Sequence, residues 1–230
     1  MKKSGDSHKG VLLFDLDGTL IDTSGDIVRS VNYIRRTLGM SLLSVEEIIG
    51  CIGQGNFYLL SHATGIDEKD PKFAEIVDKF KEFYLAHQTE RSQPYPGMRQ
   101  VLEHLSGDYE LFVLSNKPHV AVLAELAGHR FEGFFREIWG AGALPQMKPD
   151  PVGILKAAKL SMLPLSRTVM IGDMLPDVEA AKNAGSKSCF VSWGFGEISE
   201  QYPKPSVVVD RVPDLVAALD NLVSERQRAG

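Results

Sequence analysis

The sequence predicts an α/β fold with a parallel sheet and an inserted all-helical domain. From residue 95 onward, short apolar runs alternate with segments of helical periodicity, a pattern typical of a parallel sheet covered on both faces. Residues 22–92 show helical periodicity without a strand pattern. We therefore expect a core domain of residues 1–21 and 93–230 and an inserted helical domain of residues 22–92.

The first predicted strand is the apolar run of residues 11–14, with β-branched and aromatic members and a glycine turn behind it. Asp15 and Asp17 follow it directly, at the end of the strand where open α/β sheets bind ligands. Two acidic groups there repel each other and lose hydration, which destabilises the fold. A divalent cation and a phosphate ester would remove this conflict, so the pair is a candidate catalytic site.

The inserted region is predicted to be helical because apolar residues recur there at helical spacing. We expect helices over residues 27–38, 45–49, 57–62 and 73–87. Gly39 follows the first of them and is a suitable residue to end it.

The remaining elements alternate along the chain. Strands are predicted at residues 111–114, 137–139, 168–171, 188–192 and 207–209, and helices at residues 120–126, 152–160, 178–184 and 215–222. Asp150 is a predicted N-cap with Pro151 in the first helical position, and Gly185 ends the third of these helices.

Composition excludes several classes of protein. A hydrophobic content of 43% with 24% charged residues is ordinary for a globular chain. A net charge of -5 without a basic stripe argues against nucleic acid, and no apolar run approaches the ~20 residues that cross a bilayer. Cys51 and Cys189 are far apart, so a disulfide or cysteine metal site is not expected. The first apolar segment runs into Asp15 and is unlike a signal peptide, so we expect a cytoplasmic protein.

Polar residues also follow other predicted strands. Ser115, Asn116 and Lys117 come after the strand that ends at Leu114, and Asp173 comes after the strand that ends at Ile171. If these strands are parallel neighbours, the polar groups meet at one edge of the sheet. The segment Lys148-Pro149-Asp150-Pro151 forms a rigid turn into a helix.

These motifs resemble a known superfamily. Asp15-x-Asp17-Gly18-Thr19, Ser115, Lys148 and Gly172-Asp173-x-x-x-Asp177 are similar, in order, to the four motifs of the haloacid dehalogenase (HAD) superfamily. Residues 15–22, 95–97, 115–118 and 177–185 further resemble phosphoglycolate phosphatases. The resemblance implies a Rossmann-like, HAD-like core with a helical cap.

The reactive groups can be assigned roles from their chemistry. Asp15 is the predicted nucleophile, since a carboxylate can attack phosphorus and form an aspartyl-phosphate. Asp17 is the predicted general acid that protonates the leaving alkoxide and then the base that activates water. Lys148 would stabilise the phosphoryl oxygens and the Asp15 carboxylate. The alternative for the aspartates is an ordinary Asp-Gly turn after a strand.

Substrate contacts are expected from the hydroxyl groups of Thr19 and Ser115 and from backbone amides of the Gly18 turn. Asn116 is a further substrate-binding candidate. Ser115 could instead cap a helix, a role that Asn116 could also take.

A metal site is predicted from the acidic residues. Asp15 and Asp173 would be ligands, Asp17 would contribute its backbone carbonyl, and Asp177 would lie close, directly or through water or a hydrogen bond. Such hard oxygen ligands suit Mg²⁺. The alternative for Asp177 is a charge at a helix N-terminus. Met174 stands where the resembling phosphatases usually have a small polar residue.

The helical insertion is placed to act as a lid over the site. Gly53, Gln54 and Gly55 form a candidate substrate loop, because the glycines let backbone amides approach an anion. An ordinary interhelix turn explains the loop equally well. The loop Trp193-Gly194-Phe195-Gly196 resembles one near the site in these phosphatases, although a packing role is no less expected.

The sequence therefore predicts a Mg²⁺-dependent phosphatase for small phosphorylated metabolites, with 2-phosphoglycolate as the first candidate. It would act on a small-molecule phosphate ester as a monomer or homodimer, without nucleic acid or membrane. A sugar phosphomutase of the same superfamily and a non-catalytic partner-binding protein are the alternatives. A dehalogenase is disfavoured because its reaction needs no cation.

Overall fold

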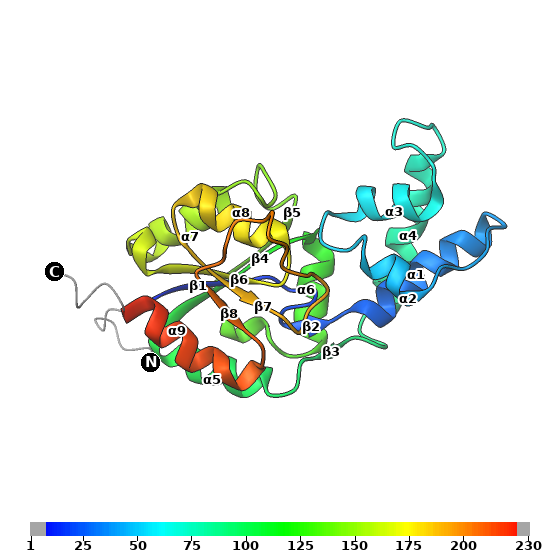
Figure 1. Cartoon of the computed structure of the whole chain (residues 1–230). Helices are drawn as coiled ribbons and strands as arrows, with labels where there is room; N and C mark the ends of the chain where they lie inside the picture. The colour runs from blue at the N-terminus through cyan, green and yellow to red at the C-terminus, as the bar shows by residue number, and fades with distance from the viewer. Residues whose placement is uncertain (1–7, 225–230) are drawn as a thin grey trace.

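The computed structural model describes residues 8–224. In this part of the chain, six parallel strands form one sheet in the order β5-β4-β1-β6-β7-β8 (Figure 1). The strands are β1 (Gly10–Phe14), β4 (Tyr109–Pro118), β5 (Glu137–Ala141), β6 (Thr168–Gly172), β7 (Lys187–Val191) and β8 (Val207–Val209). The predicted α/β fold with a parallel sheet is confirmed.

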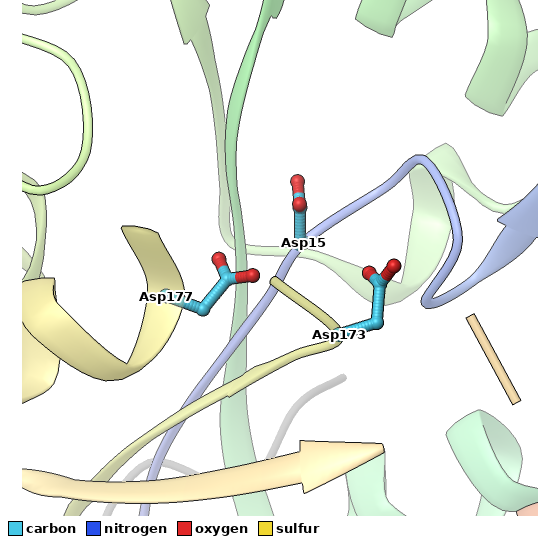
Figure 2. Close-up of side chains that lie close together, drawn as sticks. All are labelled: Asp15, Asp173 and Asp177. Carbon is cyan, nitrogen blue, oxygen red and sulfur yellow. The ribbon is translucent and has the colours of Figure 1, made fainter. Parts of the chain in front are cut away.

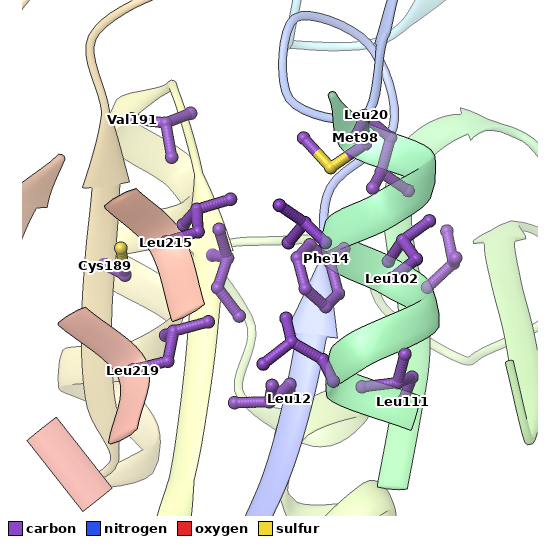
Figure 3. Close-up of a cluster of buried hydrophobic side chains, with 14 of the residues drawn as sticks. Leu12, Phe14, Leu20, Met98, Leu102, Leu111, Cys189, Val191, Leu215 and Leu219 are labelled. Atoms are coloured by element: carbon purple, nitrogen blue, oxygen red, sulfur yellow. The ribbon is translucent and has the colours of Figure 1, made fainter. Parts of the chain in front are cut away.

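Helices cover both faces of the sheet. They are α5 (Met98–Asp108), α6 (His119–Gly128), α7 (Val152–Ser161), α8 (Leu175–Ala184) and α9 (Leu215–Ser224), with short 3-10 turns at η1 (Glu132–Phe134), η2 (Leu165–Arg167) and η3 (Val212–Asp214). Leu12 and Phe14 of β1 pack with residues of α5 and α9 (Figure 3). Val11 and Leu13 pack with residues of α7 and α8 on the other face. This division follows from the alternation of side chains along a strand.

The inserted region forms four helices in the described chain, which gather to one side of the sheet (Figure 1). They are α1 (Ser24–Thr37), α2 (Val45–Ile49), α3 (Asn56–Thr64) and α4 (Phe73–His87). Their apolar faces bury a common cluster around Val31, Leu60 and Phe80, to which Ala121 of α6 adds. Gly39 follows α1 with a φ of +70°, as expected for a residue that ends a helix.

Several boundaries differ from the sequence prediction. Two short antiparallel strands, β2 (Ile21–Asp22) and β3 (Gln93–Pro94), join the ends of the insertion and were not predicted. Each has only two residues and is defined by pairing with a segment distant in sequence, so no local pattern indicates it. The helix α7 begins at Val152, so Pro151 rather than Asp150 is its N-cap residue. The Asp150 carboxylate still accepts a hydrogen bond from the Val152 amide at 2.9 Å, in the turn before the helix.

Strand β4 is longer than predicted because it continues through Ser115, Asn116 and Lys117. Its pairing with β5 shifts register between Leu114 and Pro118. These polar residues therefore lie in an irregular end of a strand, where side chains can be redirected from the regular alternation.

Cys189 is buried and Cys51 partly exposed, and both are free thiols. Within residues 8–224, no helix has the length and apolar character needed to cross a membrane.

Candidate active site

Three aspartates from different segments meet at the carboxyl edge of the sheet (Figure 2). Asp15 follows β1, Asp173 follows β6, and Asp177 lies in the first turn of α8. Each offers a carboxylate oxygen that lies within 4.8 Å of those of the other two, and all three residues are buried. Because β1 and β6 are hydrogen-bonded neighbours that run parallel, their carboxyl ends meet as the sequence predicts.

Lys148 lies between two of these carboxylates. Its Nζ is 3.0 Å from Oδ1 of Asp15 and 2.7 Å from Oδ1 of Asp177, with 2% of the side chain exposed. Burial lowers the pKa of Lys148, but the charges of Asp15 and Asp177 outweigh this effect and raise its pKa above the ordinary value. The ammonium group is therefore a permanent positive charge beside Asp15.

Lys148 alone would not balance three ionised carboxylates at this site. Burial, together with the charges of Asp15 and Asp177, raises the pKa of Asp173 to about 8. Burial also raises the pKa of Asp177 to about 6, against the opposing effect of Lys148. The buried oxygens thus suit a divalent cation, which would compensate the excess charge.

Asp173 is held in place by its surroundings. Thr19 Oγ1 donates a hydrogen bond to Oδ1 at 2.7 Å, and the Phe195 amide donates one to Oδ2 at 2.8 Å. Gly18 has a φ of +80°, and a Cβ at this position would lie 2.3 Å from Asp173 Oδ2. The loop of residues 193–196 thus lies at the site, and the turn after Asp17 requires glycine.

The carboxylate of Asp17 is held apart from this trio. Its Oδ1 accepts hydrogen bonds from Thr23 Oγ1 and Lys117 Nζ, each at 2.7 Å. The Lys117 side chain is 4% exposed. Burial lowers the pKa of Lys117, but the negative charges of Asp17 and Glu125 raise it above the ordinary value on balance.

Lys117 also begins a buried polar network that joins the helical insertion to the core. Its Nζ donates to the Tyr84 hydroxyl of α4 at 2.6 Å, and that hydroxyl donates to Glu125 Oε2 of α6 at 3.4 Å. Glu125 is fully buried and also accepts a hydrogen bond from Ser92. The motif around Ser115 contained Lys117, but no local pattern indicates that Tyr84 and Glu125 lie beside it.

A cavity of about 390 Å³ lies between the insertion and the core. Its walls include predicted site residues from both parts, namely Asp15, Asp17, Gly53, Gly55, Ser115 and Asn116. Gln54 lines a neighbouring cavity of about 450 Å³, together with Lys148 and Met174. Gly18 and Thr19 line neither of these two cavities.

Asn116 connects the two parts of the chain. Its Nδ2 donates to the carbonyl of Gly53 at 3.2 Å and to that of Lys148 at 3.0 Å, and its Oδ1 accepts from the Lys148 amide at 2.9 Å. The side chain of Asn116 therefore fixes the backbone around Lys148 and meets the loop of residues 53–55.

The fold and the site together define a hydrolase-type α/β core whose reactive edge carries carboxylates and a buried lysine, beneath a helical insertion. The model of the haloacid dehalogenase-like hydrolases matches residues 12–191. The chain belongs to this family.

The similarity to known proteins extends over nearly the whole length of this chain. The chain is 32% identical over 216 residues to a phosphoglycolate phosphatase from Aquifex aeolicus, covering 94% of this chain and 99% of that one. It is 30% identical over 218 residues to a phosphoglycolate phosphatase from Agrobacterium fabrum, covering 93% and 94% respectively. A crystal structure from Haemophilus somnus, described as a predicted phosphoglycolate phosphatase, superimposes with a TM-score of 0.83 at 25% identity, covering 93% and 98%. The chain is a phosphoglycolate phosphatase-like enzyme of the phosphoric monoester hydrolase class.

Proposed function

We propose that this enzyme is a Mg²⁺-dependent phosphatase for small phosphorylated metabolites, with 2-phosphoglycolate as the leading substrate. The observation that carries the proposal is the buried contact of Lys148 with both Asp15 and Asp177 beside Asp173. The names of the relatives from Aquifex aeolicus and Agrobacterium fabrum support the substrate.

The surroundings of Asp15 support its proposed role as the nucleophile. Its Oδ1 accepts a hydrogen bond from the Leu16 amide at 2.7 Å and lies 3.0 Å from Lys148 Nζ. Its Oδ2 accepts no hydrogen bond from residues 8–224, and Asp15 lines the cavity. In the proposed first step, Oδ2 attacks phosphorus, the bond from phosphorus to the ester oxygen breaks, and an aspartyl-phosphate forms.

In the proposed mechanism, Asp17 transfers a proton in both steps. It donates a proton to the leaving alkoxide in the first step. In the second step it takes a proton from water, whose oxygen attacks phosphorus as the bond to Asp15 breaks and phosphate leaves. Lys117 and Thr23 fix Asp17 Oδ1 from two directions, so we assign them as positioning residues.

The remaining site residues would bind the phosphate group and the metal ion. Ser115 lines the cavity beside Asp15 and would donate a hydrogen bond to a phosphoryl oxygen. Asp15, Asp173 and Asp177, with the Asp17 backbone carbonyl, would hold Mg²⁺, and a bound Mg²⁺ would offset charge on the phosphate oxygens. Thr19 would act through Asp173, to which its hydroxyl donates.

We further propose that residues 22–92 form the lid domain, with residues 1–21 and 93–230 as the core. The predicted core range extends beyond the described residues at both ends. The apolar cluster of α1–α4 supports this division, and the cavity walls come from both parts. The loop of Gly53, Gln54 and Gly55 would close the site around the substrate.

The direct test measures phosphate release from 2-phosphoglycolate with Mg²⁺ and after chelation. We expect release that depends on Mg²⁺, and a loss of about 10³-fold or more in Asp15→Asn, because the amide is not a nucleophile for phosphorus. Glucose phosphates serve as comparison substrates. Interconversion of these sugars with little phosphate release would indicate a phosphomutase. No phosphate release from any phosphate ester tested would contradict the proposal.

A further inference from the structure

The cavity beside Asp15 has walls of contrasting chemistry. The core contributes carboxylates, Ser115 and Lys117, whereas the helical insertion contributes mostly apolar side chains. These apolar residues come from α1, the loop after α2, α3 and α4, and they are Ile27, Ile52, Leu59, Phe80 and Leu85. A side chain at the core end of the cavity, Val120 of α6, adds to this apolar surface.

Most of this apolar wall is rigidly packed. Phe80 is 2% exposed and Leu59 is 4% exposed, so both are held by the apolar cluster of the insertion while one surface faces the cavity. The wall is therefore preformed, and an apolar group of a ligand that lay against it would leave water without ordering new side chains.

The same wall has few cationic side chains that could pair with a second acidic group of a substrate, besides its phosphate. Lys117 is buried, but its ammonium group already pairs with Asp17 at 2.7 Å and donates to Tyr84 at 2.6 Å. Lys81 lines the cavity but is 45% exposed, with Asp78 at 3.8 Å. Among the described residues that line the cavity, none is an arginine and His119 is the one histidine. The apolar part of this wall, away from the phosphate site, thus suits a neutral, apolar group.

We propose that this enzyme also binds and hydrolyses phosphate monoesters of larger apolar alcohols, with the alcohol moiety lying against Leu59, Phe80 and Leu85. The hydrolysis rests on the proposed function, whereas the binding of the apolar group does not. A cavity of about 390 Å³ exceeds the need of a two-carbon alcohol such as that of 2-phosphoglycolate. Its size falls in the range of pockets that enclose larger ligands.

The test separates binding from turnover by using a homologous series. Ethyl-, butyl- and hexylphosphonate cannot be hydrolysed, and their dissociation constants can be measured by calorimetry with Mg²⁺ present. Affinity is expected to rise about four-fold for each methylene that is buried, the factor that corresponds to about 0.8 kcal/mol. We expect a gain of at least about ten-fold from ethyl- to hexylphosphonate. Equal affinity along the series would overturn the inference.

Turnover of ethyl, butyl and hexyl phosphate then tests the second half of the proposal. The three leaving alcohols have similar reactivity, so a rise of kcat/KM with chain length reports contact with the apolar wall. If the phosphonates bind with rising affinity but only 2-phosphoglycolate is hydrolysed, the hydrolysis of alkyl esters fails while the binding site stands. If neither these esters nor 2-phosphoglycolate is hydrolysed, the proposed function fails as well. If 2-phosphoglycolate is hydrolysed but the series is flat, only this inference fails.

A pair of variants locates the contact. Leu85→Ser removes an apolar side chain that lines the cavity and is 42% exposed, so the fold should tolerate the change. We expect the hexyl-to-ethyl affinity ratio to fall by about four-fold or more. Leu123→Ser is the matched control, because Leu123 is 41% exposed and lies outside the cavity wall. An unchanged ratio in Leu85→Ser would contradict the proposed placement of the alcohol.

Discussion

Lys117 and Lys148 are both buried lysines at the same edge of the sheet, yet they face different carboxylates. Lys148 contacts Asp15 and Asp177, whereas Lys117 contacts Asp17. This separation keeps the proposed nucleophile and the proposed proton carrier in distinct electrostatic surroundings. Two neighbouring carboxylates can then perform different tasks.

A prediction at the scale of the residue concerns Lys117→Met. Loss of the ammonium group removes one of two contacts that orient Asp17, so proton transfer to a poor leaving group should suffer most. We expect the single-turnover rate with ethyl phosphate to fall about 10²-fold, the usual effect of general acid catalysis. Release of 4-nitrophenolate from its phosphate, which needs little protonation, should fall much less.

Three control measurements accompany this prediction. Lys117→Arg should restore part of the rate, since a cation is kept near Asp17. Lys79→Met, which removes an exposed ammonium group beside Glu75, should leave both rates unchanged. Far-UV circular dichroism shows whether each variant is folded, and an equal loss with both substrates in a folded Lys117→Met protein would argue against positioning of the acid.

At the scale of elements, the buried hydroxyl of Tyr84 links helix α4 to the core by hydrogen bonds. Tyr84 accepts a hydrogen bond from Lys117 of β4 and donates one to Glu125 of α6. Burial raises the pKa of Tyr84 well above its ordinary value, so the hydroxyl stays neutral and can serve both partners. The insertion is thereby tied to the strand that carries Ser115.

We predict that Tyr84→Phe lowers the free energy of unfolding by about 1.5–3 kcal/mol, because the hydrogen bond to a charged partner is lost within a buried region. Urea denaturation measures this change. Tyr33→Phe is the matched control, since Tyr33 is 37% exposed and its ring stacks on Phe83. Equal stability of Tyr84→Phe and the parent would show that the network does not hold α4 to the core.

At the scale of the whole molecule, the acidic trio joins segments that lie far apart in the chain. Asp15 comes from the first strand, and Asp173 and Asp177 come from the sixth strand and the helix after it. Their mutual repulsion opposes the folded state, so a cation that binds only the folded arrangement should stabilise the whole protein.

We predict that Mg²⁺ raises the melting temperature and that a chelator reverses the rise. At a free concentration 100 times the dissociation constant, the gain is about 2.7 kcal/mol. For a chain of this size, that corresponds to roughly 5–10 °C. Asp173→Asn should lose most of the shift, whereas Asp210→Asn should keep it, because Asp210 is not part of the trio and accepts a hydrogen bond from Ser192. A shift that survives in Asp173→Asn would place the cation elsewhere.

The local sequence pattern was sufficient to predict most of the strands and helices. Residues 11–14 are apolar and precede an Asp-x-Asp turn, so a buried strand with acidic groups at its end follows from sequence alone. The same holds for Asp173 after β6, because strand and motif are adjacent in the chain. The parallel arrangement then requires these ends to meet, and the structure confirms that they do.

The partners of particular side chains did not follow from local pattern. Thr19 was expected to face a phosphate, yet its hydroxyl donates to Asp173 and the side chain is fully buried. The strands β2 and β3 likewise depend on a pairing across the whole insertion. Such contacts depend on the packing of distant segments, which no window of sequence describes.

By itself, the sequence determined the order of strands and helices along the chain, the helical insertion and the positions of the acidic motifs, because hydrophobic periodicity and turn residues act between near neighbours. Only the tertiary structure decided that Lys117 pairs with Asp17, that Tyr84 and Glu125 complete this network, and that apolar side chains of the insertion face the cavity. The physical reason is that buried charges and cavity walls depend on desolvation and on distances between groups far apart in sequence, and these quantities exist only once the chain has folded.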